Sequence, residues 1–230
     1  MDIHSSSQPD VDVAQALSEQ IEKHKNTPLL LLLAGGSALQ ILDLLDTAYI
    51  NEYVTIMMMD ERYSSNPEEN NFLQMTLTAF YTITKMQGVT FIPSVPTVEE
   101  THEDFTCRIE SQLKNYITET PEVTVFALFG IGPDGHTAGI FPMEKESFVD
   151  TYGQGQLYTK VVYDKNSSPL RTSITPKFIT TYITKSLVYA TGEGKRPILQ
   201  TISDPYELHE LPSHIHKQID SELFTDLTIT

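Results

Sequence analysis

The residues best suited to chemistry lie in the segment Phe-Ala-Leu-Phe-Gly-Ile-Gly-Pro-Asp-Gly-His-Thr, which spans positions 126–137. His136 can act as a general base near neutral pH, and Asp134 can orient its ring or contact substrate hydroxyl groups. Pro-Asp-Gly is also an ordinary turn signal, and a lone histidine in a turn is usually structural. The segment follows a deeply apolar run, however, and a plain surface turn does not need three glycines, Gly130, Gly132 and Gly135. The pattern therefore favours a catalytic loop.

A second segment is suited to holding a phosphate group. Gly35 and Gly36 follow the apolar run 29–33 and precede a segment of helical spacing, so main-chain N–H groups are exposed where a helix begins. Ser37 can cap that helix or donate to an anion. An ordinary strand-to-helix turn is the alternative interpretation. The spacing matches neither a dinucleotide fingerprint nor a nucleoside triphosphate loop.

Charged residues follow other strand-like runs. Asp60, Glu61 and Arg62 come directly after one, and alternation along a strand lets one carboxylate face a pocket while the other pairs with Arg62. Arg171 offers a guanidinium fork for phosphate, and Lys195 offers a mobile charge beside a Gly-rich turn. Each of these could also be a solvated strand or loop end. Their shared position at strand ends is what favours a common site.

The elements that must position these residues alternate along the chain. Short apolar runs separated by segments of helical periodicity predict βαβ units, hence an α/β fold with a largely parallel sheet. With no linker and no internal repeat, residues 1–230 are expected to form a single domain, and residues 143–157 indicate a surface excursion. Strands are predicted over residues 29–33, 54–59, 90–93, 123–129, 158–163 and 187–191. Helices are predicted over residues 11–23, 39–45, 71–81, 99–117 and 195–202, with a short one over 177–182. Asn70 and Asn71 are as easily helix caps as ligands.

Composition narrows the classes of function. The 31 acidic and 15 basic residues give a formal charge of −16, which opposes nucleic-acid binding and requires any phosphate pocket to concentrate cations locally. A single cysteine, Cys107, excludes an intrachain disulfide and suits a reducing cytosol. No signal peptide or membrane span is recognised, so a cytoplasmic location without membrane contact is expected. His209, His214 and His216 have no standard metal spacing, so no metal site is expected.

Taken in order, five motifs resemble those of the 6-phosphogluconolactonase family, which is grouped with glucosamine-6-phosphate deaminases and isomerases. They are Ala-Gly-Gly-Ser at 34–37, Met-Asp-Glu-Arg at 59–62, Gly-Ile-Gly-Pro-Asp-Gly-His-Thr-Ala-Gly-Ile-Phe-Pro at 130–142, Arg-Thr-Ser-Ile-Thr at 171–175 and Gly-Glu-Gly-Lys at 192–195. The continuation after His136 is of the lactonase type, and Asp-Glu-Arg points the same way because deaminases usually carry Asp-Glu-Tyr.

The resemblance implies an open, mostly parallel Rossmann-like sheet with helices on both faces, and hydrolysis of 6-phospho-D-glucono-1,5-lactone in the pentose phosphate pathway. It implies no cofactor, a small sugar phosphate as ligand, and a monomer or small homo-oligomer. The implied base for the hydrolytic water is His136. The implied phosphate ligands are Gly36, Ser37, Arg171 and Lys195, and the implied sugar-pocket residues are Asp60, Arg62 and Asp134.

The sequence departs from the family pattern in several places. Ala38 and Leu39 stand where the family usually has Thr-Pro, Asn70 stands where Ser is frequent, and Gly139 replaces a usual Ser. These changes can weaken binding, alter the substrate or have little effect. Two alternatives therefore stay open: an amino-sugar phosphate deaminase or isomerase, and a sugar-phosphate binding protein without activity.

Overall fold

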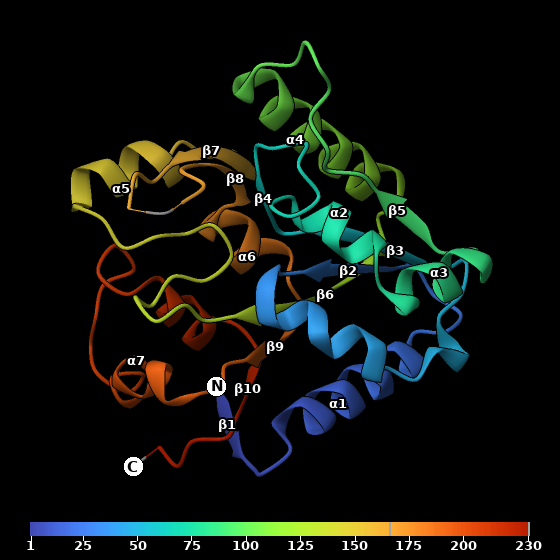
Figure 1. Ribbon diagram of the computed structural model, residues 1–230, viewed down its shortest axis with the longest axis horizontal. Coiled ribbons are helices and arrows are strands. Elements are labelled where there is room, and N and C mark those ends of the chain that lie inside the picture. Colours follow the sequence, from blue (N-terminus) through green and yellow to red (C-terminus); the bar gives the residue numbers. More distant parts are fainter. Residues whose placement is uncertain (166, 230) are drawn as a thin grey trace.

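The computed structural model describes residues 1–165 and 167–229, which form two β-sheets with helices packed around them (Figure 1). The larger sheet is parallel throughout, with strand order β1-β10-β9-β6-β2-β3-β5. Its strands are β1 (Asp2–Ser5), β2 (Leu29–Leu33), β3 (Val54–Met58), β5 (Thr90–Ile92), β6 (Thr124–Gly130), β9 (Lys185–Tyr189) and β10 (Ser221–Thr225). The predicted α/β fold with a mostly parallel sheet is confirmed, although strands β1 and β10 were not predicted from the sequence. The single domain over residues 1–230 stays a prediction.

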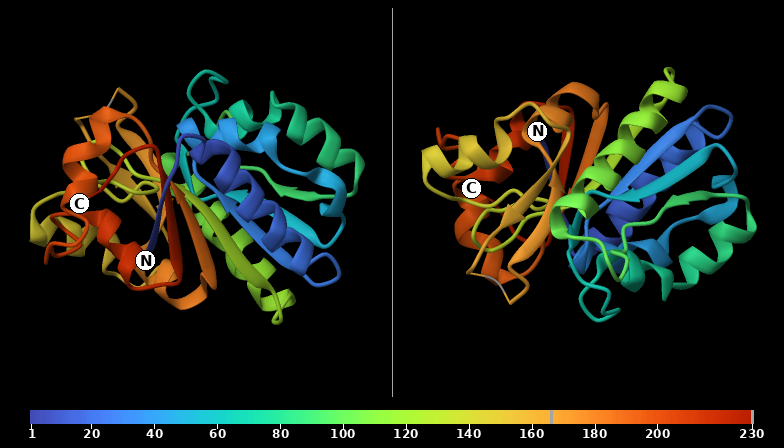
Figure 2. Two further views of the ribbon diagram at one scale, coloured as in Figure 1. Left: turned by 90° about the horizontal axis from the view of Figure 1, so that it is seen from below. Right: turned by 90° about the horizontal axis from the view of Figure 1, so that it is seen from above.

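The central strands are buried on both faces, as a parallel sheet covered by helices requires. All five leucines of β2 are buried, and so is every residue of β3. Helix α1 (Pro9–Lys23) and helix α4 (His102–Glu119) lie on opposite sides of this sheet (Figures 1 and 2). Helices on both faces, the second feature expected of the fold, are therefore confirmed.

Several helix boundaries differ from the sequence prediction for local reasons. The segment predicted as a helix over 39–45 is the 3₁₀-helix η1 (Gly36–Leu44). The helix predicted over 71–81 is two helices, α2 (Asn71–Thr76) and α3 (Ala79–Met86), because Thr78 caps the second one. A Thr101–Asp104 capping box starts α4 at His102, later than predicted. The remaining helices are α5 (Lys145–Tyr152), α6 (Pro176–Tyr182), η2 (Thr47–Tyr49), η3 (Glu193–Lys195), α7 (Arg196–Gln200) and η4 (Pro212–Lys217). Within the described ranges, no helix is long and apolar enough to cross a membrane.

The smaller sheet is antiparallel and was not anticipated from the sequence. Its order is β4 (Asp60–Arg62), β8 (Leu170–Ile174) and β7 (Tyr158–Val162). The strand predicted over 158–163 therefore exists, but it pairs with β8 and lies outside the parallel sheet. β4 follows β3 after one residue, so the small sheet extends from the carboxyl end of the large one.

The order of the strands creates a crevice between β2 and β6. After β2 the chain moves to β3 on one side, and after β6 it moves to β9 on the other side. Neighbouring strands whose connections diverge in this way leave a gap beyond their carboxyl ends, where ligands of open α/β sheets bind. The Gly-Gly-Ser segment follows β2 and the His136 loop follows β6, so the fold brings these two motifs together.

Candidate active site

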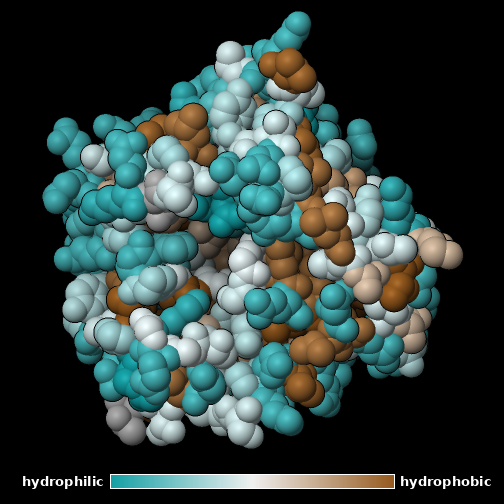
Figure 3. Space-filling view, viewed as in Figure 1, coloured by the Kyte–Doolittle hydropathy of each residue, from teal (hydrophilic) through white to brown (hydrophobic). Residues whose placement is uncertain are grey.

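A cavity of about 240 Å³ opens at the carboxyl ends of β2 and β6. The space-filling view shows the same face hollowed near its centre (Figure 3). Seven of the eight residues predicted for the site line this cavity, and Asp134 stands just behind His136. The lining residues are Ala34, Gly35, Gly36, Ser37, Asp60, Arg62, Gly130, Ile131, Gly132, His136, Ala138, Arg171 and Lys195.

The turn after β2 forms one wall of the cavity. A Cβ on Gly35 would lie 2.0 Å from Asn71 Oδ1, so only glycine fits there, and Gly36 has a φ of +65°, which favours glycine. The 3₁₀-helix η1 begins at Gly36, and the first N–H groups of a helix lack partners within it. Gly35 is the N-cap and Ser37 lies inside the helix, so the capping role considered for Ser37 is wrong, while its place on the cavity fits a donor to an anion.

Strands β4 and β8 present charged side chains on one shared face. Asp60 pairs with Ser173 and Arg62 pairs with Arg171 in the antiparallel register, so these four residues point to the same side. Arg171 Nη1 lies 3.8 Å from Asp60 Oδ2. Burial lowers the pKa of Arg171, the charge of Asp60 opposes that shift, and the charge of Arg62 adds to it. Two guanidinium groups directly opposite each other repel, which an anion bound between them would relieve.

Arg62 is held by a neighbour that the sequence analysis did not single out as its partner. Its Nη1 donates to Asn71 Oδ1 at 2.5 Å and to the Glu69 carbonyl at 2.9 Å. The expected pairing of the Arg62 guanidinium with one of the two preceding carboxylates is wrong, because its hydrogen bonds go to Asn71 and Glu69. Alternation turns Glu61 to the opposite, buried side, where it accepts the Arg62 N–H at 2.8 Å. Asn71 therefore positions Arg62, and Asn70, the other residue left open, is the N-cap of α2.

Glu61 anchors the start of α2 beneath the site. It accepts the N–H groups of Asn71 and Phe72 at 2.6 and 2.9 Å and the hydroxyl of Ser94 at 2.9 Å. Burial raises the pKa of Glu61 to about 8, while the main-chain N–H groups oppose that shift. This buried side chain, which accepts from Arg62, Asn71, Phe72 and Ser94, fixes α2, and with it Asn71, against the β2 turn.

His136, which lines the cavity, forms a pair with Asp134. His136 Nδ1 lies 2.5 Å from Asp134 Oδ1, which places the ring in the tautomer whose Nε2 is unprotonated and available as a base. Burial opposes ionisation of Asp134, but its hydrogen bond and charge interaction with His136 outweigh burial and lower its pKa. Gly132 makes room for the pair, since a Cβ there would lie 2.1 Å from the His136 ring. Of the two roles considered for Asp134, orienting the ring is the one that this geometry fits.

Two aromatic residues that were not predicted as site residues, Phe141 and Tyr152, hold the rest of the His136 loop in place. The Phe141 ring lies 4.8 Å from that of His136 and 5.5 Å from the guanidinium carbon of Arg171. Tyr152 Oη donates to the Gly139 carbonyl at 2.8 Å and accepts the Phe141 N–H at 3.1 Å. Tyr152 belongs to α5, so the segment 143–157, predicted as a surface excursion, contains a helix that holds the loop. Phe141 and Tyr152 lie within sixteen residues of His136, but their spacing matches no helical or strand periodicity that would have pointed to these contacts.

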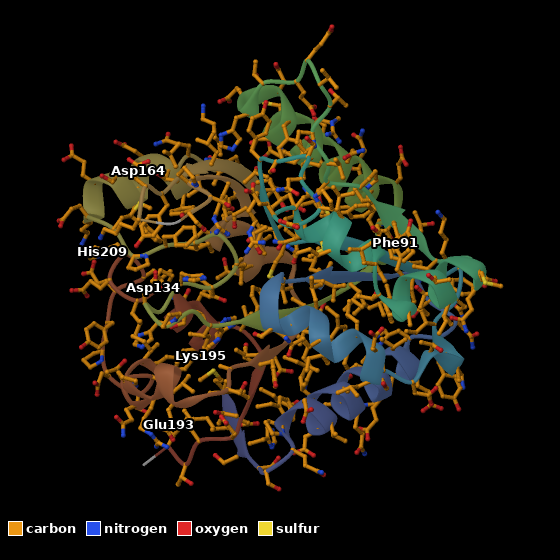
Figure 4. The ribbon with its side chains drawn as sticks, in the orientation of Figure 1. Phe91, Asp134, Asp164, Glu193, Lys195 and His209 are labelled. Atoms are coloured by element: carbon orange, nitrogen blue, oxygen red, sulfur yellow. The ribbon has the colours of Figure 1, made fainter. Side chains whose placement is uncertain are left out.

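Lys195 approaches the cavity from the turn after β9. Its Nζ donates to the carbonyl oxygen of Ile131, and Figure 4 shows Lys195 and Asp134 on neighbouring segments. Burial lowers the pKa of Lys195. Arg196, the other basic residue of this turn, is turned away: its guanidinium pairs with Glu193, and it is not part of the cavity lining.

One departure from the family pattern, Gly139, has a structural explanation. A Cβ on Gly139 would lie 2.7 Å from the Ser173 Cβ, and the Gly139 N–H donates to Ser173 Oγ at 3.0 Å. Ser173 thus fills the space that a serine at 139 would need. Ala38 and Leu39 are 1% and 8% exposed and belong to the hydrophobic core.

The curated proteins that match this chain are 6-phosphogluconolactonases. The chain is 29% identical to human 6-phosphogluconolactonase over 136 residues, which are 57% of this chain and 47% of that protein. The bovine 6-phosphogluconolactonase is also 29% identical, over 133 residues. The chain spans about half the length of the curated relatives it matches.

Solved structures share the fold over nearly the whole chain. A 6-phosphogluconolactonase from Shewanella baltica superimposes with a TM-score of 0.81 at 16% identity, covering 97% of this chain and 96% of that one. The enzyme from Thermotoga maritima gives 0.77 at 21% identity, with 97% and 99% covered. The sequence model of glucosamine-6-phosphate isomerases/6-phosphogluconolactonase matches residues 7–225. This protein therefore belongs to the glucosamine-6-phosphate isomerase/6-phosphogluconolactonase family.

Proposed function

We propose that the protein hydrolyses 6-phospho-D-glucono-1,5-lactone to 6-phospho-D-gluconate, the lactonase step of the pentose phosphate pathway. The observation that carries the proposal is the composition of the cavity. Arg62, Arg171 and Lys195 line it together with the β2 turn, and His136 lines it with the Asp134 carboxylate against its ring. In a chain of charge −16, such a concentration of cations matches an anionic substrate. The relatives named 6-phosphogluconolactonase support the same reaction.

In this proposal the substrate phosphate binds between the β2 turn and two cations. The N–H groups of Gly36 and Ser37 and the Ser37 hydroxyl donate to its oxygens at the start of η1. Arg171 and Lys195 neutralise its charge. Asp60 lines the cavity beside Arg171 and is suited to accept from sugar hydroxyl groups. The oligomeric state and the cytoplasmic location stay predictions.

The proposed chemistry uses the side chains alone. His136 Nε2 removes a proton from water, the oxygen attacks the lactone carbonyl carbon, and Arg62 stabilises the negative charge that develops on the carbonyl oxygen. The ring ester bond then breaks, and the leaving ring oxygen takes the proton back from His136. Asp134 holds the imidazole in the required tautomer and stabilises its cationic form. No metal or organic cofactor enters these steps.

The test is the loss of the lactone above its spontaneous rate, followed by titration of the acid released. We expect wild-type protein to accelerate that loss in proportion to its concentration. A parallel assay measures ammonia released from glucosamine 6-phosphate, which the isomerase branch of the family would produce. Thermal stabilisation by 6-phosphogluconate without turnover of either substrate would instead identify a binding protein and contradict the proposal.

The phosphate assignment predicts a selective loss of substrate affinity. Arg171→Ala and Lys195→Ala should each raise KM about 10- to 150-fold, the equivalent of one charge-assisted contact, with a smaller effect on kcat. Arg196→Ala is the matched control, because Arg196 neighbours Lys195 but pairs with Glu193 outside the cavity. An unchanged KM in both cavity variants, or an equal rise in the control, would place the phosphate elsewhere.

A further inference from the structure

The C-terminal part of the chain presses against the His136 loop from behind. The Ser213 N–H donates to the Gly135 carbonyl at 3.0 Å. Gly135 has a φ of +83°, and a Cβ there would lie 2.1 Å from Leu211 Cδ1. Three residues further along η4, His216 Nε2 lies 3.0 Å from Thr137 Oγ1. Both His216 and Thr137 are fully buried.

The protonation state of His216 follows from its partner. Thr137 Oγ1 donates its hydrogen to the Gly130 carbonyl at 2.9 Å, so toward His216 it can only accept. The ring must therefore carry its hydrogen on Nε2. Across the described ranges His216 Nδ1 has no partner, and a hydrogen there would be a buried, unpaired donor. Burial lowers the pKa of His216 to about 3, which keeps the ring neutral.

This contact closes the base of the loop that carries His136. Thr137 follows His136 directly, and its hydroxyl reaches back to Gly130, the last residue of β6. The Thr137 side chain thus joins the two ends of the 130–137 loop, and its second contact is with His216. Because the loop contains three glycines, its unrestrained conformational freedom is large, and such a bridge removes part of it.

We propose that His216 is a positioning residue for the reaction, which acts through Thr137 to fix the loop that aims His136 at the substrate. The inference rests on the proposed function for its kinetic consequences only. His216 does not line the cavity, and it packs edge-on against Phe129 of β6, at 4.7 Å between ring centroids. It therefore joins the sheet and the C-terminal helix η4 to the catalytic loop without touching the substrate.

The kinetic test separates kcat from KM. Thr137→Val and His216→Leu should each lower kcat about tenfold, less than the roughly 100-fold cost of a 1 Å misplacement, and leave KM within about twofold. KM should change less than kcat because the phosphate-binding groups lie after β2, on β8 and after β9, although Lys195 contacts the loop at the Ile131 carbonyl. The double variant should lose no more than Thr137→Val alone, because that change already removes the Thr137–His216 contact together with the Thr137–Gly130 hydrogen bond.

Conservative replacements and a control guard against a merely structural explanation. His216→Gln, whose amide can donate to Thr137, and Thr137→Ser should keep most of kcat. Ser213→Ala is the matched control, because Ser213 Oγ is buried in the same helix η4 and, in the part of the chain described, makes no hydrogen bond. Independent additive losses in the double variant, no recovery with glutamine, or an equal loss in the serine control would each overturn the proposal.

A measurement without turnover separates this proposal from the proposed function. In ¹⁵N spectra of imidazole-labelled wild-type protein, His216 should show a neutral ring protonated at Nε2 from neutral pH to about pH 4. Thr137→Val should shift that signal while thermal unfolding stays cooperative. A His216 ring protonated at Nδ1, or one that titrates near its usual pKa, would overturn the inference even if the protein hydrolyses the lactone. Inactive wild-type protein with the expected spectrum would instead overturn the proposed function.

Discussion

Replacing His136 with alanine is expected to lower kcat for the lactone about 10²- to 10⁴-fold, the usual contribution of a positioned general base. The physical reason is that water is a poor nucleophile unless its proton is removed as it attacks. In the structure His136 is the cavity residue whose ring nitrogen can accept that proton, because Nδ1 is committed to Asp134. KM should change little, since phosphate affinity is assigned to Arg171 and Lys195. Initial rates, corrected for spontaneous lactone opening, give both constants.

A control variant and a binding measurement distinguish loss of the base from damage to the cavity. His209→Ala is the control for losing an imidazole, because His209 pairs with Glu207 at 3.3 Å and does not line the cavity. Binding of 6-phosphogluconate to His136→Ala, measured by thermal shift, should match wild type and show that the cavity is intact. If His136→Ala retains wild-type kcat, the base is another group and the proposed mechanism is wrong.

The central part of the fold could be predicted because its signal is local. The five leucines of β2 and the apolar run of β3 indicate buried parallel strands, and both lie where they were expected. The edge strand β1 was missed because its four residues are exposed and carry no apolar alternation. β4 and β8 are short and rich in polar residues, and their pairing depends on contacts between residues more than 100 positions apart. No window of the sequence contains that information.

The site shows the same division between local and distant information. His136, Arg62 and Lys195 could be found because glycine-rich loops and charges follow strands, and strand ends meet at one edge of a parallel sheet. The partner of Arg62 could not be assigned, because alternation along β4 buries Glu61 and leaves Asn71 to hold the guanidinium. Asn71 opens a helix, so it was considered a cap or a ligand. Its contact with Gly35 joins residues far apart in the sequence, so no local pattern could reveal it.

Adding a side chain at Gly132 is expected to lower activity strongly, because the absence of a side chain there lets His136 and Asp134 meet. A Cβ at Gly132 would lie 2.1 Å from Nδ1 and Cε1 of His136 and 2.8 Å from Asp134 Oδ1. These distances are well below ordinary van der Waals contact, so the imidazole or the carboxylate has to move. The φ of Gly132 lies outside the left-handed region, so the backbone itself accommodates alanine. The substitution therefore displaces the pair with little direct strain on the main chain.

We expect Gly132→Ala to lower kcat about 100-fold, the cost of misplacing a catalytic group by roughly 1 Å, with KM close to wild type. Gly194→Ala is the matched control: Gly194 lies in the turn beside Lys195, and its added Cβ would meet nothing within 4 Å. Steady-state kinetics give kcat and KM for both variants, and their melting temperatures show whether either variant is destabilised. A methyl group leaves His136 chemically intact, so a selective loss of kcat in Gly132→Ala would show that the position of the imidazole matters as well as its presence. Wild-type kcat in this variant would mean that the His136–Asp134 geometry is dispensable, and Asp134 would then lose the orienting role assigned to it.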